Sequence, residues 1–355
     1  MIEKTKTPRV KPELNDKLPF GKHLADHLLE INWTAEAGWD LPRIKPYGPF
    51  IMDPSTSVLN FAIECFEGMK AYKNAKSEVL LFRPLRNMER MRSSGKALCL
   101  PDYDPEEFLL CIVELLKLDR DWVPQKEGFS LYLRPTFIGD SDMFELGRPQ
   151  AAKLFVINSP VGPYYSTGFK PVALYCDNTA ARAYPGGMGH YKLGGNYAAG
   201  IKHAERIAKL GYQQMLWLID DNVTEVGTMN FFVRWRNENG VEELITAPLD
   251  GTILPGVTRE SILSLVRGWG EILVSEKKFS IADLVKASEE RRLIECFGCG
   301  TAAVVSPVEK FYYNGKDYTV PLALGNSGEL TKRLWDKLIA IQYGITKHPW
   351  CYVLD

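Results

Sequence analysis

The strongest constraint on the fold is a ten-residue segment near the middle of the chain, residues 159–168. This segment, Ser-Pro-Val-Gly-Pro-Tyr-Tyr-Ser-Thr-Gly, holds two prolines and two glycines, which interrupt regular secondary structure. A chain of 355 residues is long enough for about two domains, so we place the boundary here. The expected division is a smaller N-terminal α/β domain (residues 1–160), an interdomain loop (161–171) and a larger C-terminal domain (172–355).

Hydrophobic periodicity predicts both helices and strands on each side of this segment. Asp104 followed by Pro105 predicts a capped helix start, and Ser280 with Asp283 predicts another. The predicted fold class is therefore α+β, with two unequal mixed α/β domains. Helices are expected at residues 87–98, 105–118, 196–209, 258–269 and 330–341, and strands at 129–135, 153–158, 172–176, 215–219, 229–235, 244–247 and 302–307.

Composition and charge favour a small-molecule partner. The net charge of −1 gives no overall field to attract nucleic acid or an anionic membrane. No run of 18 apolar residues and no secretory signal is present, so we expect no membrane partner. Seven irregularly spaced cysteines do not form a secreted disulfide framework, which favours a cytoplasmic location. A mitochondrial location stays open if a transit peptide was removed, and the polar N-terminus is expected to be frayed.

Lys192 is the residue that most strongly suggests chemistry. It lies in residues 186–197, Gly-Gly-Met-Gly-His-Tyr-Lys-Leu-Gly-Gly-Asn-Tyr, where the glycines let the backbone approach a ligand closely. Neighbouring aromatic rings lower the local polarity and favour the neutral, nucleophilic amine. A lysine on a helix face is usually a solvated charge, but this setting suits Schiff-base formation with a carbonyl.

Two further segments are candidates for anion binding. Residues 252–259 run through a Pro-Gly pair into a helix expected to start near Thr258, and the N–H groups of a first helical turn bind anions. An ordinary turn with a threonine cap is the alternative. Residues 297–302, Phe-Gly-Cys-Gly-Thr-Ala, could bind an oxyanion through Thr301 or could form a bulged strand entry.

Glu225 is a candidate partner for a positively charged ring. It lies beside the apolar Val223, Val226 and Met229, and a half-buried carboxylate is costly unless it meets a cation or a protonated nitrogen. A pyridinium nitrogen would be a suitable partner. On local sequence alone, a solvent-facing glutamate at a turn is the alternative.

Taken in order, residues 191–197, 224–230, 253–259 and 298–302 resemble the branched-chain amino-acid aminotransferases, which are pyridoxal-phosphate (PLP) enzymes of fold type IV. The resemblance extends from about residue 20 to the C-terminus. It implies the two-domain type IV fold and a homodimer in which residues from the partner close the site. The implied reaction is reversible transfer of the amino group of L-leucine, L-isoleucine or L-valine to 2-oxoglutarate, which gives branched 2-oxo acids and L-glutamate. Further matching segments are residues 66–70, 81–84, 87–91, 131–135 and 341–344.

The resemblance also implies which residues bind the cofactor. Lys192 would form the aldimine with PLP and would then shuttle the proton from the substrate Cα to the cofactor. Glu225 would pair with the pyridine nitrogen, and Tyr197 would hydrogen-bond the phenolic oxygen. The implied phosphate ligands are Arg90, the backbone of Val257 and Thr258, and the hydroxyl of Thr301.

The implied substrate pocket combines apolar walls with one cation. Arg134 matches the residue that binds the distal carboxylate of glutamate, while Thr228 and the backbone of Ala302 would hold the α-carboxylate. Without the resemblance, core packing and a structural ion pair would explain Arg134 and its neighbour on the same strand face. The aromatic walls that suit branched aliphatic side chains are Phe20, Phe66, Tyr132 and Tyr164.

Three departures from the family pattern stand out. Phe61 replaces a frequent tyrosine, which removes one hydroxyl from the glutamate-binding side. Mammalian members carry a redox Cys-x-x-Cys at positions that here are Ala303 and Ser306, so that switch is predicted absent. Cys296 and Cys299 form a Cys-x-x-Cys elsewhere, but three extended residues span roughly 10 Å. A disulfide needs Cα atoms within about 7 Å, so we expect no redox pair there.

Other interpretations of the chain remain as alternatives. The lysine, glutamate and phosphate residues would also serve a D-amino-acid transaminase or an aminodeoxychorismate lyase. A non-catalytic PLP carrier with this fold is the alternative from another class of protein. His23 and His27 have zinc-helix spacing but lack the glutamate of His-Glu-x-x-His, so we expect no metal site.

Overall fold

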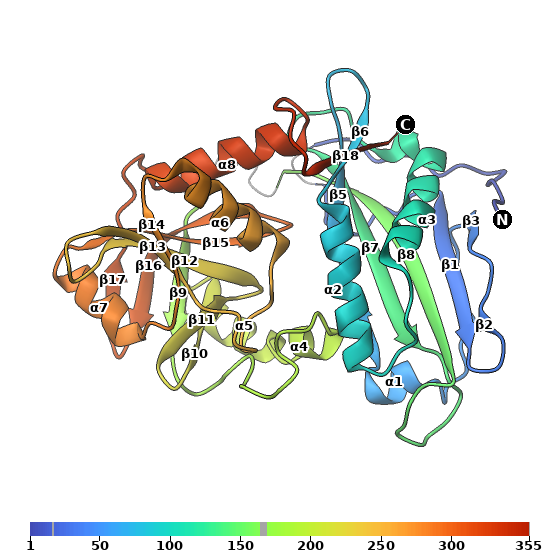
Figure 1. The fold of residues 1–355 in the computed structure, drawn as a ribbon, viewed down its shortest axis with the longest axis horizontal. Coiled ribbons are helices and arrows are strands. Elements are labelled where there is room, and N and C mark those ends of the chain that lie inside the picture. The colour runs from blue at the N-terminus through green and yellow to red at the C-terminus, as the bar shows by residue number, and fades with distance from the viewer. Residues whose placement is uncertain (16–17, 164–168, 355) are drawn as a thin grey trace. The chain divides into compact units, whose positions relative to one another are not determined.

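The computed structural model describes residues 1–15, 18–163 and 169–354, which form two compact units built on separate β-sheets (Figure 1). The first unit comprises residues 1–166, 191–195 and 339–355, and the second comprises residues 167–190 and 196–338. Helices α4 (Gly194–Ala198) and α8 (Glu329–Gln342) each contain residues of both units. Helices and sheets occur in both units, which confirms the α+β class. Among the described residues, no helix has the length and apolar character that a membrane crossing requires.

The first unit contains a nine-stranded antiparallel sheet. Its main path runs in the order β18-β6-β5-β7-β8-β1-β2, with β3 paired to β1 and β4 paired to β7. The C-terminal strand β18 thus pairs with β6, from the first quarter of the chain. The strands are β1 (His27–Thr34), β2 (Gly38–Trp39), β3 (Arg43–Pro46), β4 (Glu64–Phe66), β5 (Met69–Lys73), β6 (Val79–Phe82), β7 (Ser130–Gly139), β8 (Ala151–Val161) and β18 (Cys351–Leu354).

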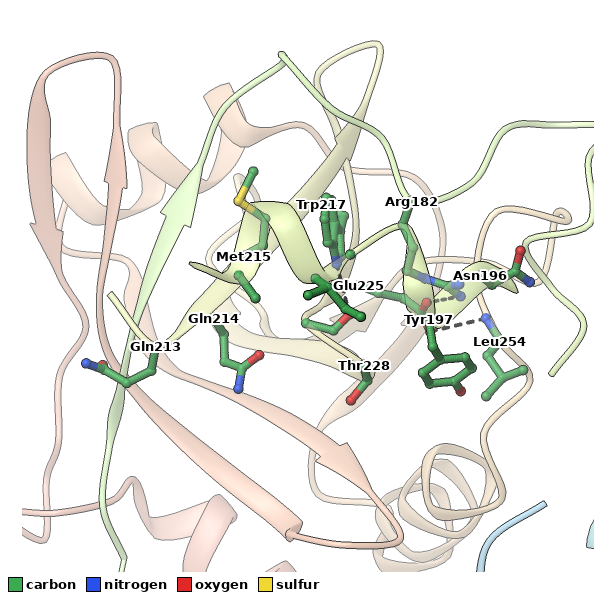
Figure 2. A pocket seen from close by; sticks show the side chains of 14 residues that line it. Arg182, Asn196, Tyr197, Gln213, Gln214, Met215, Trp217, Glu225, Thr228 and Leu254 are labelled. Carbon is green, nitrogen blue, oxygen red and sulfur yellow. Dashed lines mark hydrogen bonds and ion pairs between the residues drawn. The ribbon is translucent and has the colours of Figure 1, made fainter. Parts of the chain in front are cut away.

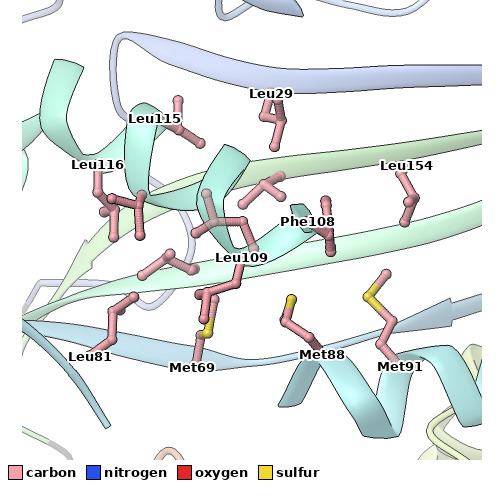
Figure 3. Close-up of a cluster of buried hydrophobic side chains, with 14 of the residues drawn as sticks. Leu29, Met69, Leu81, Met88, Met91, Phe108, Leu109, Leu115, Leu116 and Leu154 are labelled. Carbon is pink, nitrogen blue, oxygen red and sulfur yellow. The ribbon is translucent and has the colours of Figure 1, made fainter. Parts of the chain in front are cut away.

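The helices of the first unit are α1 (Ser57–Phe61), α2 (Pro84–Ala97), α3 (Pro105–Leu118) and the short 3-10 helix η1 (Arg120–Trp122). The predicted start of α3 is confirmed, because the Asp104 carboxylate accepts from the backbone N–H groups of Glu106 (2.8 Å) and Glu107 (3.1 Å). Helices α2 and α3 pack on the sheet through buried leucine, methionine and phenylalanine side chains (Figure 3). This core holds α2 against the sheet, and α2 carries several of the residues discussed below.

The second unit contains a mixed sheet of nine strands that closes on itself. Strands follow the order β11-β10-β9-β16-β15-β12-β13-β14, β17 pairs with β16, and a further pairing of β11 with β12 closes a ring. The pairs β9–β10, β9–β16 and β13–β14 are parallel. The strands are β9 (Val172–Cys176), β10 (Gln214–Ile219), β11 (Asn222–Val226), β12 (Met229–Arg236), β13 (Glu242–Thr246), β14 (Leu273–Glu276), β15 (Leu293–Gly300), β16 (Val304–Tyr313) and β17 (Lys316–Thr319).

The other helices of the second unit are α5 (Ile201–Ala208), α6 (Val257–Trp269) and α7 (Ile281–Glu289). The predicted start of α7 is a complete capping box, since Ser280 and Asp283 each accept from the backbone N–H of the other. The single helix predicted over residues 196–209 is wrong, because α4 and α5 are separate. Glycines are poor helix formers, and Gly200 lies at the break.

Two other expectations, on where β8 ends and on the order of the N-terminus, are wrong. Strand β8 continues through Pro160 to Val161, although this stretch was expected to be irregular. The pairing of β8 with β1 ends at Val156, so Pro160 lies where no partner on that side needs its missing N–H. The N-terminus is also ordered rather than frayed, because Met1 and Glu3 exchange backbone hydrogen bonds with Ile44.

Candidate active site

Lys192 lies in the first unit, in an irregular segment just before α4. Two hydrogen bonds hold its backbone. Its N–H donates to Oγ of Ser94 on α2 (3.0 Å), and its carbonyl accepts from the N–H of Phe66 at the end of β4 (3.1 Å). Leu193 adds an isolated bridge to Cys65 on β4. Helix α2 and strand β4 therefore position the lysine, although no regular element contains it.

The Lys192 side chain lies among aromatic rings and charges. Its Nζ is 4.7 Å from the centre of the Phe66 ring. Burial, helped by the positive charge of Arg90, lowers the pKa of Lys192 to about 8, although Glu67 and Tyr132 act in the opposite direction. A pKa in this range leaves an appreciable neutral fraction of the amine at neutral pH, which a nucleophilic lysine requires.

Arg90, predicted as a phosphate ligand, lies on α2 and forms a bidentate pair with Glu67. Nε donates to Oε1 (2.7 Å) and Nη2 donates to Oε2 (2.8 Å), while Nδ2 of Asn87 also donates to Oε2 (2.9 Å). Burial opposes ionisation of the fully buried Glu67, but the charge and hydrogen bonds of Arg90 prevail and lower its pKa. Sequence reasoning did not assign Glu67 a role, because nothing in the local pattern indicates a partner 23 residues away.

Four of the predicted pocket residues come together in the first unit. Tyr132 and Arg134 lie two residues apart on β7, so they face the same side of the sheet. The Arg134 guanidinium lies over the rings of Phe66 (4.7 Å) and Tyr132 (5.2 Å), and its Nη2 donates to the Tyr132 hydroxyl (3.1 Å). Phe20 packs edge-on against Tyr132, with ring centres 4.7 Å apart. Tyr164 lies outside the described residues.

The second unit contains a pocket of about 200 Å³ next to α4 and α5 (Figure 2). Three residues predicted from the sequence, Tyr197, Glu225 and Thr228, line it. The pocket is mainly apolar, and Glu225 supplies a carboxylate to its lining. Its other lining residues are Arg182, Asn196, Gly200, Ile201, Ala204, Gln213, Gln214, Met215, Trp217, Gly227 and Leu254.

Glu225 lies on β11 with 3% of its surface exposed, so the alternative of a solvent-facing glutamate is wrong. Its Oε1 accepts from Nδ2 of Asn230 (2.9 Å) and from the backbone N–H of Leu254 (3.1 Å). Its Oε2 pairs with Arg182, whose side chain approaches from the segment before the lysine (Figure 2). No signal in the sequence indicated Arg182, which precedes the glycine-rich segment in a stretch without periodicity.

The helix start predicted near Thr258 is confirmed. Helix α6 begins at Val257, and its N-cap, Gly256, has no side chain to occupy the first-turn N–H groups of Val257 and Thr258. Asn230 fixes the preceding loop, since its Nδ2 donates to the carbonyl of Leu254 (2.8 Å). A Cβ atom added at Gly256 would lie 2.1 Å from Oδ1 of Asn230. The start of α6 is thus tied to the same side chain that holds Glu225.

Thr301 and Ala302 lie in the turn between β15 and β16. The register of β15 with β12 places Cys299 opposite Asn230. Continuing this register by two residues brings the turn beside Thr228, in the turn between β11 and β12. The second unit therefore gathers the predicted α-carboxylate residues and the predicted phosphate residues other than Arg90 around the start of β12.

Across residues 1–15, 18–163 and 169–354, no group of three or more His, Cys, Asp or Glu residues is arranged to hold a metal ion. His27 lies on β1, and its Nδ1 is 2.6 Å from Oδ1 of Asp119. Cys296 and Cys299 are buried three positions apart on β15, so their side chains leave opposite faces of the strand.

Comparisons with known proteins place the chain in a family. Residues 64–311 match the family described as amino-transferase class IV. The branched-chain-amino-acid aminotransferases of Dictyostelium discoideum and Monosiga brevicollis are each 51% identical to the chain, over 100% and 99% of it and over 94% and 91% of their own lengths. The cytosolic relative of Saccharomyces cerevisiae is 47% identical over 95% of the chain and 92% of its own length. Relatives named mitochondrial also match, so both compartments allowed from the sequence are represented.

The fold is shared with solved structures at lower identity. The branched-chain aminotransferase of Thermoproteus uzoniensis, solved with norvaline, superimposes with a TM-score of 0.74 at 24% identity, over 92% of this chain and 99% of that one. The Escherichia coli branched-chain amino acid aminotransferase gives a TM-score of 0.70 at 21% identity, over 92% and 98%. Fold and family match together define a class IV aminotransferase. Within that class, the chain belongs to the branched-chain-amino-acid aminotransferase family.

Proposed function

We propose that this aminotransferase moves the amino group of L-leucine, L-isoleucine or L-valine to 2-oxoglutarate, with PLP as its cofactor. The observation that carries the substrate assignment is the 51% identity, over the full chain, to relatives named branched-chain-amino-acid aminotransferases. Solved structures of another branched-chain amino acid aminotransferase with this fold contain pyridoxamine 5'-phosphate or N-(5'-phosphopyridoxyl)-L-glutamate. A homodimer, and a division into two domains around residues 161–171, are part of the proposal.

The residues of this chain suit PLP chemically. Glu225 is buried and forms an ion pair with Arg182, and a carboxylate is the partner that a protonated ring nitrogen requires. The start of α6 offers first-turn N–H groups for a phosphate, with no side-chain cap in their way. The residues that would hold the cofactor are Arg90, Lys192, Tyr197, Glu225, Val257, Thr258 and Thr301.

Lys192 is the proposed catalytic residue. When bound, PLP supplies an aldehyde that takes up the amino group and a ring that withdraws electrons from the substrate Cα. Lys192 would bond to the cofactor through its neutral amine, which its lowered pKa makes accessible. Once an amino acid has displaced it, the same amine would take the proton from the substrate Cα and deliver it to the cofactor.

The proposed substrate site has an apolar wall and two places for carboxylates. Thr228 and the backbone of Ala302 would hold the α-carboxylate that all substrates share. Arg134 would bind the second carboxylate of glutamate or 2-oxoglutarate through its partly buried guanidinium. Branched aliphatic side chains would pack on the aromatic residues Phe20, Phe66, Tyr132 and Tyr164.

The absorbance spectrum of the purified, PLP-loaded protein tests this proposal. L-leucine should remove the visible band of the lysine-bound cofactor, and 2-oxoglutarate should restore it. Lys192→Ala should abolish both the band and turnover, whereas turnover that survives this substitution contradicts the assigned role. A preference for D-alanine over L-leucine would point instead to a D-amino-acid transaminase, and a bound chromophore without turnover would point to a carrier protein.

A further inference from the structure

Arg134 is a partly buried cation without a carboxylate in contact. Its guanidinium lies over two aromatic rings and donates once, to the hydroxyl of Tyr132 (3.1 Å). Its Nε is buried and has no hydrogen-bond partner, and the described part of the chain contains no ion pair to Arg134. A charge that is partly withdrawn from water in this way carries a cost unless another charge compensates it. Some acidic group should therefore balance Arg134 whenever the ligand itself brings no second carboxylate.

Glu64 is placed to provide that balance. It lies on β4, two residues before Phe66, and β4 pairs with β7, the strand of Arg134. Alternate residues share a face of a strand, so Glu64 and Phe66 face the side on which Arg134 covers the Phe66 ring. Glu64 feels the charges of Arg134 and Lys192, both of which favour its ionised form. Sequence reasoning gave Glu64 no role.

The surroundings of Glu64 make its ionisation sensitive to a nearby anion. Burial is the largest influence and raises its pKa, while the backbone N–H of Gly194, Arg134 and Lys192 lower it. Helix α2, which also packs against β4, contributes Arg90, but Glu67 already pairs with that cation. The net result is a raised pKa, and a loss of positive potential beside Glu64 raises that pKa further and favours the protonated carboxyl group.

The Glu64 carboxylate also lies close against the lysine segment. A Cβ atom added at Gly194 would lie 2.0 Å from Oε2 of Glu64, which shows how tightly the two groups approach. The neighbouring Cys65 thiol cannot serve as the responsive group, because burial raises its pKa well above the usual value. Of the acidic groups on β4, Glu64 is therefore the one able to exchange a proton as the pocket fills.

We propose that Glu64 is the resident counter-charge of Arg134 and that it distinguishes dicarboxylic from apolar ligands. With an apolar side chain in the pocket, Glu64 stays ionised and balances Arg134. When a second ligand carboxylate reaches Arg134, Glu64 takes up one proton from solvent, and no other bond is made or broken. This makes the binding of dicarboxylates, but not of branched aliphatic ligands, weaken as pH rises. The inference rests on the proposed function, since it takes Arg134 as the site of the distal carboxylate.

Two non-reactive ligands isolate the proton uptake caused by the second carboxylate in the PLP-loaded, full-length enzyme. Glutarate has two carboxylates and 4-methylvalerate has one, so the difference between them isolates the second carboxylate. Calorimetry in buffers of different ionisation enthalpy counts the protons taken up with each ligand. Groups that titrate with either ligand cancel in the difference. Above the pKa of Glu64, glutarate should bind with close to one more proton than 4-methylvalerate, and its Kd should rise about tenfold per pH unit.

Glu64→Gln is the decisive variant, because its amide oxygen can still accept from the Gly194 N–H. In this variant the extra proton should vanish, and glutarate should bind more tightly at alkaline pH with a Kd that no longer depends on pH. Glu64→Asp, which keeps the charge, should retain the extra proton. The circular dichroism spectrum should be the same in all three proteins, which serves as the control for folding.

Two results would overturn the inference. If Glu64→Gln keeps the pH dependence and the extra proton, another group responds and Glu64 only anchors the Gly194 segment. If the variant loses glutarate binding, Glu64 supports the second carboxylate instead of competing with it. The proposed function is judged separately, by the spectral response of the wild-type enzyme to L-leucine. A normal response together with pH-independent glutarate binding refutes the role of Glu64 alone.

Discussion

The lowered pKa of Lys192 leads to a quantitative prediction for how the apoenzyme captures PLP. Only the neutral amine attacks the aldehyde, so the capture rate follows the neutral fraction. With the pKa at about 8, roughly one lysine in eleven is neutral at pH 7. At the ordinary value of 10.5 the fraction would be roughly one in three thousand. The environment of Lys192 therefore increases the reactive form about 300-fold at pH 7.

The assay is stopped-flow absorbance, with excess apoenzyme mixed with PLP across a pH series. We expect the rate to rise about tenfold per pH unit at acidic pH and to level off near pH 8. Lys192→Ala should give no covalent capture, which separates bond formation from simple binding. A rate that continues to rise beyond about pH 10 would refute the argument, because the lysine would then behave as a solvated amine.

A second variant tests the cause of the shift. The Glu67 carboxylate raises the pKa of Lys192, so Glu67→Gln should move the levelling point to lower pH. The opposite movement would show that the disturbed Arg90 side chain, rather than the lost negative charge, controls the lysine. This outcome would contradict the balance of charges described for the first unit.

Four further substitutions test the second unit and the fold. Glu225→Gln leaves the buried Arg182 without its counter-charge, so chemical denaturation should show a loss of roughly 3–5 kcal/mol, together with weaker PLP binding. Gly256→Ala forces a contact with Asn230, so it should lower the free energy of unfolding by about 1–3 kcal/mol and weaken PLP binding. Gly268→Ala is the matched control, because no atom lies within 4 Å of the new Cβ, and it should stabilise α6 by about 0.5–1 kcal/mol. Asp104→Ala removes the N-cap of α3 and should lower the free energy of unfolding by about 1 kcal/mol without changing PLP affinity. Unfolding midpoints that do not change in these variants would contradict the contacts described.

Local signals in the sequence predicted those parts of the fold that local interactions determine. The cap at Asp104, the capping box at Ser280 and the start of α6 each depend on residues within one turn, and all three were found where expected. The extent of β8 was wrong because the tolerance for Pro160 depends on where a neighbouring strand stops. The pairing of the N-terminus with Ile44 could not be predicted for the same reason, because it joins segments that are distant in the sequence and hydrophobic periodicity does not show which segments pair.

In the candidate site, too, features set by short segments were predicted and features set by distant residues were missed. Residue types and motif order indicated Lys192 and Glu225, because their chemistry is visible in short segments. Their charge partners were missed, since the pairs Arg90–Glu67 and Arg182–Glu225 join residues that are distant in the sequence and lie in different elements. The pKa of Lys192 could be anticipated in direction from its aromatic neighbours, but its value depends on these long-range charges.

The ion pairs Arg90–Glu67 and Arg182–Glu225 lead to a prediction for the protein without its cofactor. Arg90 and Glu225, the proposed cofactor residues that these pairs contain, each have a counter-charge in their own unit, Glu67 and Arg182 respectively. Removing PLP therefore leaves neither of these buried charges uncompensated, and the apoenzyme should keep its secondary structure and unfold cooperatively. Adding PLP at a hundred times its Kd should raise stability by only about 2.7 kcal/mol, as mass action requires. Circular dichroism and thermal denaturation measure both effects. An apoenzyme that binds hydrophobic dyes and lacks a cooperative transition would show that the cofactor, and not these ion pairs, holds the site together.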